Sequence, residues 1–155
     1  MTELQIEIRR VAEQYPESRS AILPALRLAQ EQYGWLSADA FREVGEALDV
    51  TPAYCQAVAS FYDMFHLAPV GRHLVEVCTN VSCALAGAQH VLEAFESELG
   101  CSAGGTTEDG EVTLRTIECL GGCGWATVVA VDHAYHLHVK PDGVPALVEE
   151  LRGGD

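Results

Sequence analysis

Four of the six cysteines in this chain form two closely spaced pairs that could act as metal ligands. Cys78 and Cys83 enclose four residues, Cys119 and Cys123 enclose three, and thirty-five residues separate the pairs. A 2Fe-2S cluster leaves four outward coordination sites on its two irons, which four thiolates fill. Each short loop can supply both ligands of one iron while the intervening segment folds independently. The spacing therefore favours a 2Fe-2S cluster and one-electron transfer.

Other uses of cysteine fit this spacing less well. Structural zinc usually takes its ligands from C-x2-C knuckles, which are narrower than both loops, so a zinc-stabilised structural or interaction protein remains only an alternative. Disulfides need an oxidising compartment, and the N-terminus MTELQIEIRR has no apolar signal-peptide core. The C-x-x-C motif of thioredoxin-type redox pairs is absent. Cys55 and Cys101 have no partner at ligand spacing and are expected to be small, buried or half-buried residues.

Composition limits the other classes of function. The chain has 155 residues, of which 48% are hydrophobic and 21% charged, enough for one domain or a small domain with an appendage. No apolar run approaches the roughly eighteen residues of a membrane span, so we expect a soluble chain without membrane insertion. The formal charge of -14 opposes binding to a phosphate backbone, which makes nucleic acid an unfavourable partner.

Hydrophobic spacing and capping residues predict four short helices in the first part of the chain. Pro16 stops the first helix, and Gly34 ends the second. Ser37 caps the third helix, while Thr51 followed by Pro52 opens the fourth. Together the four helices would form a small bundle. They are expected from about residue 3 to 15, 18 to 34, 37 to 48 and 51 to 65.

One face of the fourth expected helix carries Tyr54, Val58, Phe61 and Phe65. Core packing is the plain interpretation of such an aromatic stripe. A docking face for a partner helix is the sharper alternative. The sequence leaves both open.

After Pro69 the pattern changes from helical spacing to strand alternation. The segment HLVEV predicts a strand that delivers Cys78, and Cys83 introduces a helix. A turn signal, EDG, precedes a second strand that delivers Cys119, so both cysteine pairs follow strand ends. A hairpin and a closing helix would complete a compact α/β layer. These elements are expected at residues 73–77, 83–99, 112–117, 127–131, 135–139 and 144–151.

Glycines surround the last cysteine. Gly121, Gly122 and Gly124 let the backbone approach the cluster and donate N–H groups to its sulfurs. They do not form a nucleotide-binding loop, because neither G-x-G-x-x-G nor the Walker pattern occurs in the chain. His136 and His138 lie two apart on an expected strand and could share one face. Solvent-facing histidines are the commoner case, so a metal role for them is the weaker interpretation.

These motifs resemble the thioredoxin-like 2Fe-2S ferredoxin family, and within it the E subunits of bacterial NADH:quinone oxidoreductase (respiratory complex I). The resemblance extends from about Pro16 to Leu151. One departure follows the last ligand, where Ala126-Thr127 replaces the usual Ala-Pro and restores a backbone N–H. The matching segments are Ser20–Pro24, Ala29–Leu36, Phe61-Tyr62 with Phe65, Pro69–Arg72, Val77–Asn80 through Cys83, Thr107–Gly110 and Glu118–Cys123.

The resemblance implies a helical N-terminal domain at residues 1–70 and a thioredoxin-like cluster domain at residues 71–155. Cys78, Cys83, Cys119 and Cys123 match the cluster ligands of the family. The chain would be an electron-transfer subunit with no catalytic residue of its own, working inside an NADH dehydrogenase. A partner flavoprotein would bind NADH and FMN and pass single electrons to one 2Fe-2S cluster.

The resemblance also implies a location and leaves one alternative open. The chain would belong to a larger respiratory complex and lie in the cytoplasm, peripheral at the inner face of the cell membrane. The equivalent diaphorase subunit of an NAD-linked hydrogenase or formate dehydrogenase shares the cysteine pattern and the helical domain. The sequence does not separate these complexes.

Overall fold

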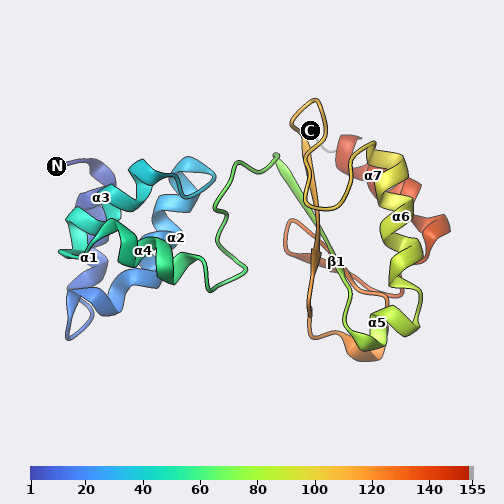
Figure 1. Ribbon diagram of the computed structural model, residues 1–155, viewed down its shortest axis with the longest axis horizontal. Helices are drawn as coiled ribbons and strands as arrows, with labels where there is room; N and C mark the ends of the chain where they lie inside the picture. Colours follow the sequence, from blue (N-terminus) through green and yellow to red (C-terminus); the bar gives the residue numbers. More distant parts are fainter. Residues whose placement is uncertain (154–155) are drawn as a thin grey trace. The chain divides into compact units, whose positions relative to one another are not determined.

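The structure, a computed structural model, describes residues 1–153 and divides into two compact units (Figure 1). The first unit, Met1–Pro69, is built from helices, and the second, Val70–Asp155, combines a four-stranded sheet with helices. Each unit has a hydrophobic core of its own. This arrangement confirms the expected α+β class. None of the described helices is long and apolar enough to cross a membrane.

Capping residues set the helix starts in the first unit. Thr2 and Gln5 form a reciprocal capping box, and the Ser37 and Thr51 hydroxyls each accept a hydrogen bond from a first-turn N–H. The first helix ends one turn before its expected end, where hydrogen bonds shift to three-residue turns. The elements are α1 (Glu3–Ala12), the 3-10 helix η1 (Ser18–Ala21), α2 (Ile22–Tyr33), α3 (Ala38–Leu48) and α4 (Pro52–Ala59).

The fourth helix ends at Ala59, so the expected continuation to Phe65 is wrong. Beyond α4, tertiary hydrogen bonds hold the backbone away from the helical path. The Gln30 side chain accepts a hydrogen bond from the His66 N–H at 2.6 Å, which fixes this segment against α2. The aromatic stripe is consequently divided: Phe65 is buried in the helical core, whereas Phe61 is 80% exposed.

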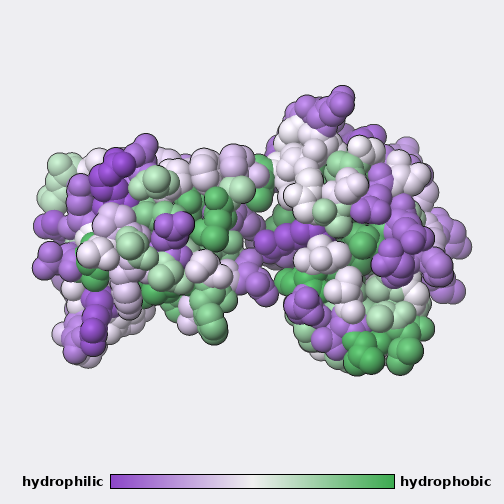
Figure 2. All heavy atoms as spheres, in the orientation of Figure 1, coloured by the Kyte–Doolittle hydropathy of each residue, from purple (hydrophilic) through white to green (hydrophobic). Residues whose placement is uncertain are grey.

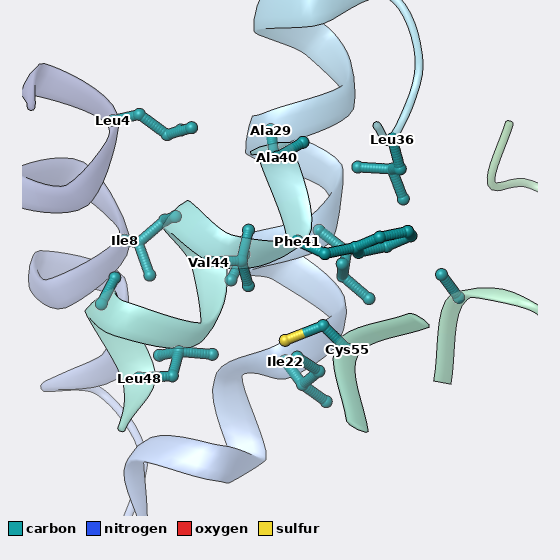
Figure 3. Close-up of a cluster of buried hydrophobic side chains, with 14 of the residues drawn as sticks. Leu4, Ile8, Ile22, Ala29, Leu36, Ala40, Phe41, Val44, Leu48 and Cys55 are labelled. Carbon is teal, nitrogen blue, oxygen red and sulfur yellow. The ribbon is translucent and has the colours of Figure 1, made fainter. Parts of the chain in front are cut away.

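Small and branched side chains fill the core of the helical unit (Figure 3). Leu4 and Ile8 of α1 meet Val44 of α3 there, and the three are almost fully buried. The Cys55 sulfur points into the same core, and burial raises the pKa of its thiol to about 11. Cys55 is thus a packing residue, as expected.

The second unit has the strand order β2-β1-β3-β4. Strand β1 is parallel to β2 and antiparallel to β3, and β4 is antiparallel to β3. Helices α6 and α7 cover one face of this sheet (Figure 1). The elements are β1 (His73–Cys78), α5 (Val81–Leu85), α6 (Ala88–Leu99), β2 (Val112–Ile117), η2 (Cys123–Trp125), β3 (Val129–Val131), β4 (Ala134–His136), η3 (Pro141–Gly143) and α7 (Val144–Gly153).

Two expectations for this unit need correction. The single helix expected after the second cysteine is divided into α5 and α6, because Gly87 is left-handed (φ 98°) and interrupts the helical hydrogen bonds. The hairpin strands are also shorter than expected. His138 lies outside β4 with φ 53°, and its N–H donates to the Trp125 carbonyl oxygen at 2.9 Å. His136 and His138 therefore do not share a strand face.

Candidate metal centre

The first cysteine pair is carried by regular secondary structure. Cys78 is the last residue of β1, and Cys83 lies in α5, whose first turn is capped by the Asn80 side chain. Both cysteines are almost fully buried, 3% and 1% exposed. They pack with Ala88 and Val128 in a small hydrophobic cluster. Two thiols are thus held in a water-poor environment at the carboxyl end of β1.

The second pair lies on an irregular, glycine-rich loop after β2. Cys119 and Cys123 are both exposed. The Gly121 N–H donates a hydrogen bond to the Cys119 sulfur at 3.3 Å, and Gly121 itself is left-handed (φ 74°). A backbone N–H aimed at a sulfur stabilises negative charge there. This loop is therefore shaped to support a thiolate.

Close packing at Gly122 holds the second loop against Val128. A Cβ atom at Gly122 would stand 2.8 Å from Cγ2 of Val128, the residue that packs against the first pair. Gly124, by contrast, has open space around it. Helix α5 and η2 are in contact, so the two cysteine loops meet at one edge of the unit. Strands β1 and β2 are parallel, and Cys78 is in register with Ile117, which places both loops after the same edge of the sheet.

The thiols of Cys78, Cys83 and Cys123 lie close enough to influence one another's ionisation. Burial raises the pKa of the Cys83 thiol, and the neighbouring Cys78 and Cys123 raise it further. All six cysteines are free of disulfides. Within residues 1–153, no three Cys, His, Asp or Glu side chains converge on a point where a single metal ion would be held. A 2Fe-2S cluster takes only two protein ligands at each iron, with sulfides between, so a donor set spread over two pairs fits it.

The two segments that carry the thiols have no charged side chain and are partly apolar, although the exposed Glu118 directly precedes Cys119. Segments 78–89 and 119–131 contain no Asp, Glu, Lys or Arg, although the whole chain carries a charge of -14. Val81 and Leu85 of α5 and Trp125 of η2 are 66%, 86% and 54% exposed, and we call these three the apolar rim. Figure 2 shows a hydrophobic surface over α5. Such a surface suits contact with another protein.

The structure places the other cysteines and histidines apart from this centre. Cys101 is half-buried beside the core of α6 and α7, as expected, and burial raises the pKa of its thiol. His136 instead lines a separate pocket of about 420 Å³ between the β3–β4 hairpin and α7. In that pocket His73 Nδ1 lies 2.6 Å from Asp132 Oδ2. This pocket shares no lining residue with the cysteine loops.

Sequence reasoning did not single out Glu76 or the burial of Thr127. Glu76 is 5% exposed, and its carboxylate accepts a hydrogen bond from Arg115 Nε at 2.8 Å across β1 and β2. Thr127 is 1% exposed and follows a cis peptide bond from Ala126. The sequence marks Thr127 only as the residue that replaces the usual Pro after Ala126, and no local pattern indicates its burial.

Comparisons with known proteins agree with this geometry. The family model for thioredoxin-like 2Fe-2S ferredoxins matches residues 8–152. The E 2 subunit of NADH-quinone oxidoreductase from Rhizobium meliloti is 41% identical over 149 residues, covering 96% of this chain and 89% of that protein. The E subunit of NADH-quinone oxidoreductase from Mycobacterium tuberculosis is 37% identical over 152 residues, covering 98% of this chain but only 60% of that protein.

A solved structure supports the fold. The air-oxidised NAD+-reducing NiFe-hydrogenase aligns with a TM-score of 0.75 and 23% identity, over 85% of this chain and 23% of that chain. At this level of identity the likeness concerns the fold alone. The family model and the identities of 33–41% to curated relatives confirm the resemblance drawn from the sequence. The chain belongs to the thioredoxin-like 2Fe-2S ferredoxin family.

Proposed function

We propose that this chain is the electron-transfer subunit of an NADH:quinone oxidoreductase and that Cys78, Cys83, Cys119 and Cys123 hold its one 2Fe-2S cluster. The observation that carries the proposal is the meeting of two free thiol pairs at one edge of the sheet, where α5 contacts η2. Relatives that match most of this chain are E subunits of NADH-quinone oxidoreductases, which supports the choice of complex.

The residues of the chain divide the work at this centre. When bound, the cluster supplies a one-electron acceptor. The buried Cys78 and Cys83 anchor one side away from water, and β1 and α5 fix their positions. The exposed Cys119 and Cys123 provide the side through which an electron can enter from a partner. The Gly121 N–H, directed at the Cys119 sulfur, stabilises negative charge on that ligand.

Hydride chemistry belongs to the partner in this proposal. Oxidising NADH needs a nicotinamide site and a two-electron acceptor such as flavin. The sequence contains no dinucleotide or phosphate-binding fingerprint. The chain therefore acts with a flavoprotein subunit that binds NADH and FMN, as a non-autonomous part of a larger respiratory complex. Its place is cytoplasmic, peripheral at the inner face of the cell membrane, with contacts to protein and no inserted segment.

A reduction assay tests this function. The purified chain should stay oxidised with NADH, bleach with dithionite, and become reducible by NADH only after the flavoprotein subunit is added. The reason is that one 2Fe-2S centre exchanges single electrons and cannot take a hydride alone. Bleaching by NADH without flavin would contradict the proposal. Zinc in place of iron, with no visible sulfide-to-iron absorption, would favour the structural alternative.

The fold similarity to the NAD+-reducing NiFe-hydrogenase keeps a second candidate, the diaphorase subunit of an NAD-linked hydrogenase or formate dehydrogenase. Affinity purification of the tagged chain from its own cells separates the two. Co-purification with quinone-reducing subunits supports the main proposal, whereas co-purification with a nickel or molybdenum subunit supports the alternative.

We also propose that residues 1–70 and 71–155 are separate domains, the first serving to dock the flavoprotein. Each has its own core, and the exposed aromatic Phe61 follows α4 near the boundary. A fragment beginning at Gly71 should keep its cluster but bind the flavoprotein poorly. Unchanged affinity would leave the helices with a structural role only.

A further inference from the structure

The Thr127 hydroxyl is a buried polar group without a partner in the described chain. Thr127 is 1% exposed, and its Oγ1 has no hydrogen-bond partner among residues 1–153. Buried hydroxyls in folded proteins are nearly always hydrogen-bonded, because an unpaired one forfeits its bonds to water. The partner of this hydroxyl is therefore to be sought outside the polypeptide.

The surroundings of Thr127 point to the metal centre. Its chain neighbours Ala126 and Val128 both pack in the small cluster formed around Cys78 and Cys83. Val128 packs against Cys83, and its carbonyl oxygen accepts a hydrogen bond from the Cys78 N–H at 3.1 Å. The residue after Thr127 thus contacts both members of the buried pair.

The backbone of Thr127 is held from another part of the unit. Its carbonyl oxygen accepts a hydrogen bond from the Val139 N–H at 3.0 Å. The backbone of Thr127 is therefore held next to Val128, the residue that packs against the buried thiols. A held backbone lowers the entropy cost of presenting the buried hydroxyl to an acceptor.

We propose that Thr127 Oγ1 donates a hydrogen bond to a sulfur of the bound 2Fe-2S cluster or of its cysteine ligands and so raises the reduction potential. The inference depends on the ligand set proposed above. Thiolate and sulfide sulfurs are acceptors, and hydrogen bonds to them are among the factors that set cluster potentials. The bond strengthens when an added electron makes the sulfurs more negative, so it favours the reduced state. Thr127 is a positioning and tuning residue, since no covalent bond to it forms or breaks.

A redox titration of the full-length, cluster-loaded protein, followed by the reduced-state electron paramagnetic resonance signal, tests the proposal. Thr127→Val keeps the shape of the side chain and removes the hydroxyl. We expect a more negative midpoint potential, with a tenfold change in the one-electron equilibrium corresponding to about 59 mV. Thr127→Ser keeps the hydroxyl and should restore most of the potential.

Thr107→Val provides the matched control. Thr107 is also buried, but its Oγ1 already accepts from the Val112 N–H at 3.0 Å and bonds to Asp109. This variant should lose stability and leave the potential unchanged. Thr127→Val, unlike Thr107→Val, should not lower the unfolding midpoint of the metal-free protein, because it removes no hydrogen bond within the chain.

Two results would overturn the inference. One is an unchanged potential in Thr127→Val with a full complement of iron. The other is a loss of metal-free stability as large as that of Thr107→Val, which would mean that the hydroxyl bonds within the protein. Failure of the proposed function looks different, because a wild-type protein without iron, or without the paramagnetic signal, would remove the cluster itself.

Discussion

The two cysteine loops of the cluster unit differ in how they hold their thiols. Cys78 and Cys83 lie on a strand end and a capped helix and are almost fully buried, whereas Cys119 and Cys123 lie on a glycine-rich loop and are exposed. The first loop is ordered by its own secondary structure and by packing. The second has an irregular backbone, held by the hydrogen bond from the Gly121 N–H to the Cys119 sulfur, by the bond from the His138 N–H to the Trp125 carbonyl oxygen, and by the close approach at Gly122. Metal bonding should therefore contribute more to the order of the second loop than to the first.

The largest expected effect comes from removing a proposed ligand on the exposed loop. Cys123→Ser should lose the cluster and loosen the loop, because metal bonding adds to the order of an exposed, irregular segment. Iron content and the reduced-state paramagnetic signal measure the loss. Cys101→Ser, outside the centre, is the control and should keep both. The ligand assignment is wrong if the signal survives Cys123→Ser but disappears with Cys101→Ser.

Thiol labelling in the metal-free protein compares the two loops directly. Only the thiolate reacts with iodoacetamide, and burial raises the pKa of Cys83, so this thiol carries less thiolate at any given pH. Near pH 8 the exposed Cys119 and Cys123 should react about a hundredfold faster than the buried Cys78 and Cys83. Because the pKa of Cys83 is raised, its labelling rate should increase with pH at higher pH values than the rate of an ordinary thiol does. Mass spectrometry of digested protein gives the rate at each site, and equal rates would remove the contrast between the loops.

The apolar rim extends the comparison to partner binding. Leu85→Glu places a charge within the apolar rim beside the centre and should weaken binding to the flavoprotein subunit about tenfold. Cluster content should not change, because Leu85 is 86% exposed and touches the centre little. Leu85→Lys distinguishes the causes, since loss of apolar contact weakens both variants while simple charge repulsion weakens only one.

Tyr135→Glu is the control for this surface. Tyr135 is 55% exposed on β4, the edge strand of the sheet, and lies outside both cysteine loops in the sequence. Calorimetric titration with the flavoprotein should give it the wild-type affinity. A loss as large as that of Leu85→Glu would show that the rim has no special part in docking.

The smallest effect concerns the packing of the second loop against Val128. Gly122→Ala brings a methyl group to 2.8 Å from the buried Val128 side chain, and overpacking of this kind costs about 1–3 kcal/mol. The φ of Gly122 is -94°, so the backbone itself accepts alanine without strain. Gly124→Ala adds the same methyl group in open space and should be close to neutral. Thermal unfolding of the cluster-loaded variants measures the difference, and equal midpoints would mean that Gly122 does not pack closely against Val128.

Local sequence patterns correctly predict several helix starts and strands of this molecule. The capping signals at Ser37 and Thr51 correctly predict the starts of α3 and α4, because a cap depends only on residues within one turn. Strand alternation likewise predicts β1 and β2 and places Cys78 at a strand end. The spacing of the cysteines was enough to favour the cluster and to lead to the family.

Other features of the structure depend on contacts between segments that are far apart in the sequence. The helix expected through Phe65 ends at Ala59, where the hydrogen bonds shift to three-residue turns, and the distant Gln30 side chain then bonds to His66, a contact that no local pattern contains. The unequal burial of the two cysteine pairs likewise follows from which residues pack over them. The partnerless state of the Thr127 hydroxyl within residues 1–153 is a property of all its neighbours together. Sequence determined the candidate ligands and the main elements through short-range rules, whereas exposure, loop contact and hydrogen-bond satisfaction arose only when segments far apart in the chain came together.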